Sequence, residues 1–370
     1  MLSSTPRVIF HVRNRRGLGH MMRGLNMALA LRERSPQVQL LFHLRAAPAP
    51  GFWPDGIAHV VDDGRGAAAA VAAFGPQVQV FDTMLPDRAA LASLRAAAPA
   101  SRLAFVMRRC LPEEQAAVYA HPSLSAMDCV LVPHTPAEFG MPVPASLRPR
   151  CHFVGPIARL PQAQAQARIV ERHGLRSDEF VLTSTVGGGG FADQADTFFE
   201  AVRQVHLHVS SMADTAPWRH IVVLGPNYTG RFEPLPGMTV VHFEPDLVNL
   251  LAASSLVIAE GGYNTVSELA LTRTPALFLP SRRGKDDQFE RVQRLADAGC
   301  ARVFDAADAA GIAAALMQLR AAPAQLADMR RCYPSAAAPV GNARAARLLE
   351  ALAVQAMTVP NDRAGQPSPA

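Results

Sequence analysis

Short runs of apolar and β-branched residues alternate along the chain with longer segments whose apolar residues recur every three or four positions. Runs of the first kind are typical of buried strands, and the second spacing is typical of helices. The strands predicted in the first half are Arg7–Val12, Val38–Leu44, Ile57–Val61, Gln77–Asp82, Arg102–Arg108 and Asp128–His134. Those predicted in the second half are Phe180–Thr185, His220–Gly225, Met238–Phe243, Ser255–Glu260 and Pro275–Pro280. The alternation favours an α/β protein with two doubly wound, Rossmann-like domains.

The same pattern sets the domain boundaries. We expect a first domain over residues 1–156, a Gln/Ala-rich linker over 157–168 and a second domain over 169–338. Residues 339–357, with an amphipathic stretch at Ala343–Leu352, are expected to form a helix that returns toward the first domain, and residues 358–370 a disordered tail. In open α/β sheets, ligands bind beyond the carboxyl ends of the strands, so two such domains facing each other predict a binding cleft.

Composition narrows the class of protein. With 49% hydrophobic and 18% charged residues among 370, the chain is expected to be globular, and it has no apolar run long enough to span a membrane. The five cysteines are scattered without zinc spacing, which favours a reducing cytoplasm and no metal site. The net charge of +5 favours anionic partners, but the basic residues do not interleave with aromatics, so nucleic acid is a poor candidate.

A glycine pair in the second half follows a predicted strand and precedes a predicted helix, in the segment EGGYNTVSE (residues 260–268). With Asn264 or Thr265 as the helix cap, the free N–H groups at the helix start can hold a diphosphate. Glu268, about one turn farther, can then reach the hydroxyls of a ribose. The alternative is structural, because Thr265 and Glu268 also have the spacing of a capping box, and both interpretations can hold together.

Two further segments can contribute to the same site. The four glycines at residues 187–190 form a second strand-to-helix turn, where the backbone can approach a ligand closely. The segment PSRRGKDDQ (residues 280–288) follows the next strand, and Asp287 and Gln288 can bind sugar hydroxyls. Its cations Arg282, Arg283 and Lys285 either bind phosphate or belong to a solvated loop.

The first half carries a different set of residues at the end of its first strand. The segment RNRRGLGHMMRG (residues 13–24) combines arginines with two glycines and places His20 at the start of a predicted helix. Histidine there can act as a general base. Asp82 ends another strand of the same domain and either orients His20 or caps a turn.

The elements GGGG, GGYNTVSE and the Asp-Gln pair of PSRRGKDDQ, in this order and spacing, resemble those of nucleotide-sugar glycosyltransferases of GT-B fold. The chain is similar to the group of the lipid-linked peptidoglycan N-acetylglucosaminyltransferase and the diacylglycerol sugar transferases. This similarity implies transfer of a sugar from a nucleotide-diphosphate donor, a UDP-sugar, to an acceptor hydroxyl by metal-independent inverting displacement. The nucleotide sugar is a co-substrate, and no other cofactor is implied. The group also implies a cytoplasmic protein with a peripheral contact to an anionic membrane.

The resemblance assigns roles to particular residues. Donor-binding roles fall on Gly187, Gly188, Gly189, Phe243, Gly261, Gly262, Asn264, Thr265, Glu268, Asp287 and Gln288. Catalytic roles fall on His20 and Asp82. Gly17 and Gly19 match the glycines that precede the histidine in the family's loop. The positive charge of Arg16, Arg23 and Arg108, which the resemblance does not assign, predicts binding of an anionic acceptor or its phosphate, and Arg108 is equally well explained as an ordinary solvated arginine. The first domain is thus expected to bind the acceptor and the second the donor.

The identity of the acceptor and the type of activity stay open. The arginines make the loop before His20 more basic than in the peptidoglycan enzyme, so the acceptor is expected to be anionic or lipid-linked. The pattern Gly-x-Gly-His-x-x-Arg is also similar to that of the nucleotide-sugar hydrolases of the pseudaminic acid pathway, for which water is the acceptor. A third interpretation, beside a transferase and a hydrolase, is a protein that binds a nucleotide sugar without catalysing a reaction. An NAD-binding site is discounted, because Met22 stands where the third small residue of that fingerprint belongs.

Overall fold

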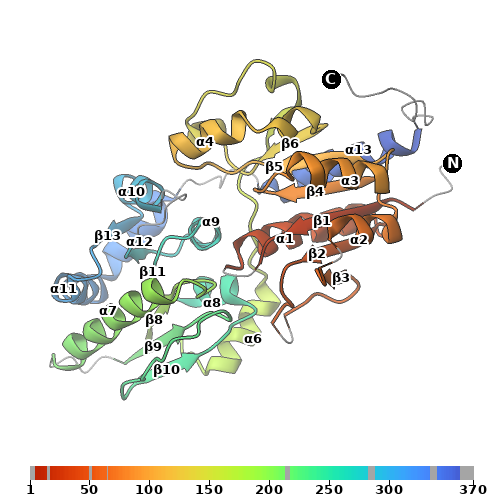
Figure 1. The fold of residues 1–370 in the computed structure, drawn as a ribbon. Coiled ribbons are helices and arrows are strands. Elements are labelled where there is room, and N and C mark those ends of the chain that lie inside the picture. Colours follow the sequence, from red (N-terminus) through yellow and green to blue (C-terminus); the bar gives the residue numbers. More distant parts are fainter. Residues whose placement is uncertain are drawn as a thin grey trace. The chain divides into compact units, whose positions relative to one another are not determined.

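The computed structural model describes residues 5–14, 17–49, 52–64, 66–212, 217–281, 288–333 and 340–358. These residues form two compact α/β units (Figure 1). The first unit contains 5–14, 20–158 and 340–358, and the second contains 17–19 and 159–333. The predicted disordered tail lies outside the described residues from 359 onward. Within the described ranges, the helices are all too short or too polar to cross a membrane.

The first unit is built on a sheet of seven parallel strands in the order β3-β2-β1-β4-β5-β6-β7. The strands are β1 (Arg7–Val12), β2 (Gln39–Leu44), β3 (Ala58–Val61), β4 (Val78–Asp82), β5 (Arg102–Val106), β6 (Cys129–Val132) and β7 (Cys151–Phe153). In the register of this sheet, Phe10 lies beside Phe42 on one side and Val80 on the other. Its central strands are buried on both faces, as expected of a parallel sheet.

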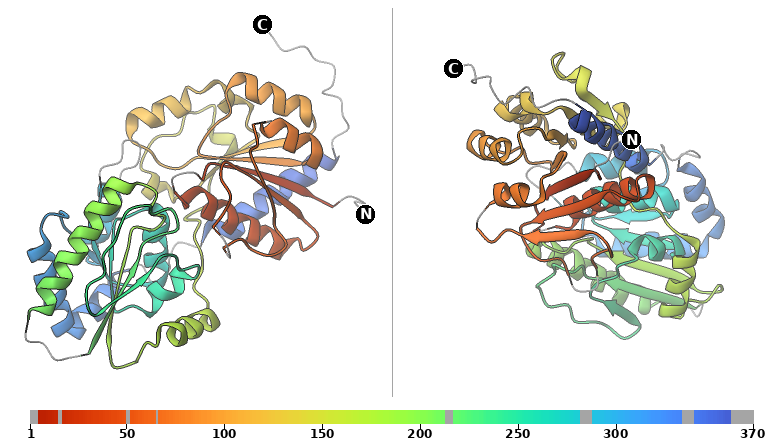
Figure 2. Two further views of the ribbon diagram at one scale, coloured as in Figure 1. Left: turned by 60° about the horizontal axis from the view of Figure 1, so that its bottom comes forward. Right: turned by 90° about the vertical axis from the view of Figure 1, so that its right-hand side faces the viewer.

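Helices lie on both faces of this sheet (Figure 2). They are α1 (Gly19–Arg34), α2 (Ala67–Phe74), α3 (Arg88–Ala97), α4 (Pro112–Tyr119), α5 (Pro136–Phe139) and α13 (Gly341–Thr358), with 3₁₀ turns at Pro122–Ala126 and Arg148–Arg150. On one face, Val71 of α2 and Leu94 of α3 share a core with Phe105. The other face is covered by α1, whose Gly24 fits against the ring of Phe42, and by α13, which contacts β4 and β5.

The second unit has six parallel strands in the order β10-β9-β8-β11-β12-β13. The strands are β8 (Phe180–Thr185), β9 (Trp218–Val223), β10 (Met238–Val241), β11 (Leu256–Ala259), β12 (Ala276–Phe278) and β13 (Ala301–Val303). The helices are α6 (Ala163–His173), α7 (Ala192–Ser210), α8 (Leu247–Ala253), α9 (Tyr263–Thr272), α10 (Gln288–Asp297), α11 (Ala309–Ala321) and α12 (Pro323–Cys332). Alternate residues of β8 separate the faces, since Leu182 packs with α7 and α11 and Val181 packs with α6 and α8.

In each sheet the strand order reverses at one place. In the first unit, β1 and β4 are neighbours although β2 and β3 separate them in sequence, and β8 and β11 stand in the same relation in the second unit. Ligands of open α/β sheets bind beyond the carboxyl ends of the strands at such a switch point. Residues 17–20, Asp82, residues 187–189 and residues 261–268 lie at or after the ends of these four strands, whereas Arg108, Phe243 and Gln288 follow other strands.

The prediction of two parallel α/β domains is confirmed, and every predicted strand is present. The three-residue strands β7 and β13 were not expected, because runs so short carry no clear periodicity. The predicted linker includes residues 163–168, which form the first turns of α6. Ala165 and Ile169, four residues apart, are buried there, a helical spacing that the Gln/Ala-rich composition conceals. The last helix is longer than Ala343–Leu352.

Candidate functional site

At the switch point of the first unit, the chain leaves β1 and reaches α1 through a loop that contains Gly17, and Gly19 is the first residue of the helix. A Cβ atom added to either glycine would meet no other atom within 4 Å. Packing within the structure therefore does not require glycine at these two positions. Arg16, which was predicted to contact the acceptor, lies outside the described residues.

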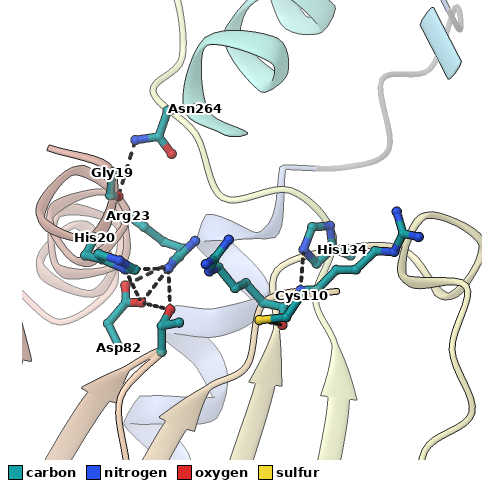
Figure 3. A network of polar contacts seen from close by, with 10 residues as sticks. Gly19, His20, Arg23, Asp82, Cys110, His134 and Asn264 are labelled. Atoms are coloured by element: carbon teal, nitrogen blue, oxygen red, sulfur yellow. Dashed lines mark hydrogen bonds and ion pairs between the residues drawn. The ribbon is translucent and has the colours of Figure 1, made fainter. Parts of the chain in front are cut away.

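Asp82, at the carboxyl end of β4, brings the side chains of α1 together (Figure 3). Its carboxylate is buried, and its Oδ1 lies 3.1 Å from Nδ1 of His20. Arg23, one turn farther along α1, donates from Nε to Oδ2 of Asp82 at 3.0 Å and from Nη2 to Oδ1. The ring of His20 is one-third exposed, at 33%, so a reactant can reach it.

The charges around Asp82 decide its ionisation. Burial by itself would raise the pKa of this carboxyl, but the adjacent Arg23 and His20 outweigh that effect and hold its pKa well below the usual value. Asp82 is therefore a carboxylate over the whole range of physiological pH. A buried carboxylate next to a histidine is suited to orient the ring and to stabilise its protonated form.

The other arginines predicted for the first domain differ in their surroundings. Arg23 is only 2% exposed, and its charge is paired with Asp82 inside the unit. Arg108 follows β5 and is partly buried. Its neighbour Arg109 donates its backbone N–H to Nε2 of His134, 3.1 Å away, at the end of β6 (Figure 3). Sequence reasoning did not single out His134, although its place as the last residue of the predicted strand Asp128–His134 was a usable signal.

In the second unit, the glycines after β8 are required by the fold itself. Gly187 and Gly189 have φ of 73° and 72°, a conformation that other residues rarely adopt. A Cβ on Gly189 would lie 2.8 Å from the carbonyl oxygen of Leu224, in the turn after β9. The oxygen of Gly188 accepts the N–H of Asn227 at 3.0 Å, which fixes the two turns together. Glu260, Gly188 and Gly189 are among the residues that line one small pocket.

The two glycines in the turn after β11 differ in whether packing requires them. Gly261 has φ of 99°, and a Cβ there would lie 2.5 Å from Cγ1 of Val292. Gly262 is the N-cap of α9, and a Cβ on it would have nothing within 4 Å. The prediction that Asn264 or Thr265 caps the helix, as in a capping box, is wrong, because α9 begins at Tyr263 and has no side-chain cap.

Asn264 and Thr265 are instead the second and third residues of α9. The N–H groups of a helix's first turn have no partner within the helix, so those of α9 point out from its start. Thr265 Oγ1 would lie 3.4 Å from a Cβ on Gly187, so the turns after β8 and β11 are adjacent. Backbone donors and open space thus meet at the switch point of the second unit.

Glu268 lies in the second turn of α9 and is 7% exposed. Burial raises its pKa to about 7, against the opposing charge of Arg159. Its carboxylate accepts no hydrogen bond from any residue that the structure describes. A buried carboxyl without a donor is costly unless a ligand provides one.

The remaining predicted donor residues follow other strands of the second unit. Phe243 is half-buried, two residues after β10. Gln288, the first residue of α10, is 1% exposed, and its Oε1 accepts the N–H of Ser281 at 3.4 Å. Ser281 also donates its hydroxyl to Glu260, a contact that sequence reasoning did not anticipate. Asp287 lies outside the described residues, as do Arg282, Arg283 and Lys285.

Comparison with known proteins finds its family match in the second unit. Residues 218–345 match the family described as Glycosyltransferase family 28 C-terminal domain. A curated relative is UDP-N-acetylglucosamine--N-acetylmuramyl-(pentapeptide) pyrophosphoryl-undecaprenol N-acetylglucosamine transferase of Burkholderia ambifaria, which is 34% identical over 137 residues. That alignment covers 36% of this chain and 37% of the relative, so it spans little more than a third of either protein.

Solved structures extend the likeness to the whole fold. Spinosyn forosaminyltransferase SpnP is similar with a TM-score of 0.62 and 18% identity, over 95% of this chain and 100% of that one. MurG from Acinetobacter baumannii is similar with a TM-score of 0.57 and 14% identity, over 94% and 99%. The prediction of a GT-B fold is therefore confirmed, and so is the resemblance to nucleotide-sugar glycosyltransferases that the sequence suggested.

Proposed function

We propose that this chain is a glycosyltransferase that moves a sugar from a UDP-sugar to an acceptor hydroxyl. The observation that carries the proposal is the buried carboxyl of Glu268, which has no donor within the described residues and lies one turn beyond the open start of α9. The match of residues 218–345 to a glycosyltransferase domain includes this helix. The name of the curated relative states a UDP-sugar as its donor.

In this proposal the second unit binds the donor. The first N–H groups of α9 and the positive end of its dipole hold the diphosphate, next to Gly262, where the backbone is open. Glu268 accepts hydrogen bonds from the ribose hydroxyls, and Gln288 takes part in sugar recognition. Two hydroxyl donors restore the polar partners that the buried carboxylate lacks, so binding shifts Glu268 toward its ionised form.

The first unit supplies the base in this proposal. The acceptor oxygen attacks the anomeric carbon and gives its proton to Nε2 of His20, while Asp82 holds the ring. The bond from the anomeric carbon to the diphosphate breaks at the same time, and UDP leaves with both electrons of that bond. Direct displacement of this kind inverts the anomeric centre. The N–H groups of α9 stabilise the leaving diphosphate, so the described residues supply this step without a metal.

We propose an anionic, lipid-linked compound as the acceptor. The curated relative's name includes a pyrophosphoryl-undecaprenol, which is both anionic and lipid-linked. The net charge of +5 is favourable for such a partner and for contact with an anionic membrane surface. Water as acceptor would make the chain a hydrolase of the same donors, and the assay below distinguishes the two.

The test is a thermal-shift screen of nucleotide diphosphates and their sugars against the wild type and Glu268→Gln. A ligand at a hundred times its Kd stabilises the folded state by about 2.7 kcal/mol, an easily measured shift. We expect one UDP-sugar to stabilise the wild type and to stabilise Glu268→Gln much less, while His20→Gln retains the full shift. Release of UDP is then followed with and without lipid-linked acceptors. Absence of stabilisation by every nucleotide sugar would contradict the proposal.

A further inference from the structure

Thr83, the residue after Asp82, has an unusual backbone conformation. Its φ is 64°, in a region that β-branched residues strongly avoid, and among the described non-glycine residues only Arg273 shares a positive φ. Strain of this kind persists only where the surrounding structure enforces it, and it clusters at functional sites. The backbone N–H of Thr83 is fixed by the oxygen of Val106, 3.0 Å away. The conformation therefore places the hydroxyl of Thr83 on a defined target.

That target is the group formed by Arg23 and Asp82. The Thr83 hydroxyl donates its single proton to Oδ1 of Asp82 at 2.7 Å. Its oxygen then accepts an N–H from Nη2 of Arg23 at 2.9 Å. The same Nη2 donates its other proton to Oδ1 of Asp82. These two oxygens are thus the nearer acceptors for the two protons of this nitrogen, ahead of Nδ1 of His20.

The contacts of Nδ1 indicate which ring nitrogen of His20 carries the proton. Nδ1 of His20 lies 3.1 Å from Nη2 of Arg23 and 3.1 Å from Oδ1 of Asp82. The two oxygens compete with the ring for the protons of Nη2, and the carboxylate of Asp82 has no proton to give. The contact with Asp82 is therefore a hydrogen bond only if Nδ1 carries the proton. A neutral ring protonated on Nδ1 has its lone pair on Nε2.

We propose that Arg23 and Thr83 are positioning residues that fix the neutral tautomer of His20, with Nε2 as the proton acceptor. Without the Thr83 hydroxyl, one proton of Arg23 Nη2 is free to bond to Nδ1 of His20, which moves the ring proton to Nε2 and removes the base. The inference extends the proposed function, because it says what keeps its general base competent. The strained backbone of Thr83 is explained by its need to hold the hydroxyl against Asp82 and Arg23.

The first test measures the tautomer directly and needs no substrate. The protein is labelled with ¹⁵N-histidine, and long-range ¹H–¹⁵N correlations at pH 8 distinguish protonated from unprotonated ring nitrogens. The signals of His20 are those that disappear in His20→Gln. We expect an unprotonated Nε2 in the wild type and in Thr83→Ser, and a protonated Nε2 in Thr83→Gly. An Nε2 proton in the wild type, or no change in Thr83→Gly, would overturn the inference.

The second test separates positioning from a structural role. Glycine tolerates the conformation of residue 83, so Thr83→Gly is expected to fold and to melt no lower than Thr83→Ser. We expect kcat for UDP release to fall about 10²-fold in Thr83→Gly with an unchanged KM for the donor, and to stay within about twofold in Thr83→Ser. Equal kcat in the two variants would refute the positioning role. If no donor is turned over at all, the proposed function fails, whereas the tautomer measurement still decides this inference.

Discussion

The switch points of the two units satisfy their polar groups in opposite ways. In the first unit, His20, Arg23 and Asp82 bond to one another, so the group is complete without a ligand. In the second, the carboxylate of Glu268 has no donor among the described residues and the first amides of α9 point outward. Side chains that perform chemistry gain from being held in place beforehand, whereas a binding site gains affinity from groups that only the ligand satisfies.

The largest effect that tests this comparison is expected from Asp82→Ala. The variant leaves the buried charge of Arg23 without its partner, so we expect the free energy of unfolding to fall by about 3–5 kcal/mol. Urea denaturation measures the loss. Asp178→Ala is the control, since it removes an exposed ion pair with Arg176 and should change the free energy of unfolding little. Equal losses in the two variants would show that the group in the first unit is not preformed.

A smaller and pH-dependent effect is expected at Glu268. Its pKa of about 7 in the folded state exceeds the ordinary 4.5, so the folded protein binds more protons than the unfolded chain between these values and stability falls as pH rises. Glu268→Gln removes that loss. We expect the variant to match the wild type near pH 4.5 and to exceed it by about 3 kcal/mol above pH 8.

Denaturation at several pH values without ligand tests this prediction. Asp82 behaves oppositely, because its lowered pKa provides stability that is lost only as pH falls below the usual range of a carboxyl. A constant difference between Glu268→Gln and the wild type at all pH values would mean that the carboxylate is already satisfied.

The smallest effects sharpen the comparison within one turn. Gly261→Ala introduces a Cβ at φ of 99° and against Val292, so we expect a loss of about 1–3 kcal/mol in stability. Gly262→Ala meets no atom and should change stability by less than about 0.5 kcal/mol. It is nevertheless expected to weaken UDP-sugar binding in calorimetry, because its methyl group occupies the space at the start of α9. Unchanged affinity in Gly262→Ala would place the diphosphate elsewhere.

The sequence predicts the elements well because buried parallel strands and amphipathic helices differ in period. It also places His20 and Asp82 at strand ends, where parallel strands bring residues together. The contact with Arg23 could have been anticipated, since residues three apart share a helix face. Sequence alone could not place Arg23 inside the unit, because its burial depends on β1 and β4 being neighbours.

Other features of the sites leave no local trace in the sequence. The positive φ of Thr83 follows from its bonds to neighbouring strands, and no residue type announces it. The N-cap of α9 was misplaced because Thr265 and Glu268 have the spacing of a capping box, while the chain turns earlier, at Gly262. The unpartnered state of Glu268 depends on the packing of α9 and on the distance of other polar groups.

The last helix determines when each unit can fold during synthesis. Gly341 donates its N–H to the oxygen of Pro156 at 2.6 Å, and Glu350 of α13 accepts from Arg34 of α1 at 2.8 Å. The first unit therefore includes residues from both ends of the described chain, whereas residues 159–333 of the second are continuous. A ribosome completes residues 159–333 of the second unit while one face of the sheet in the first unit still lacks α13. The half made first is finished last.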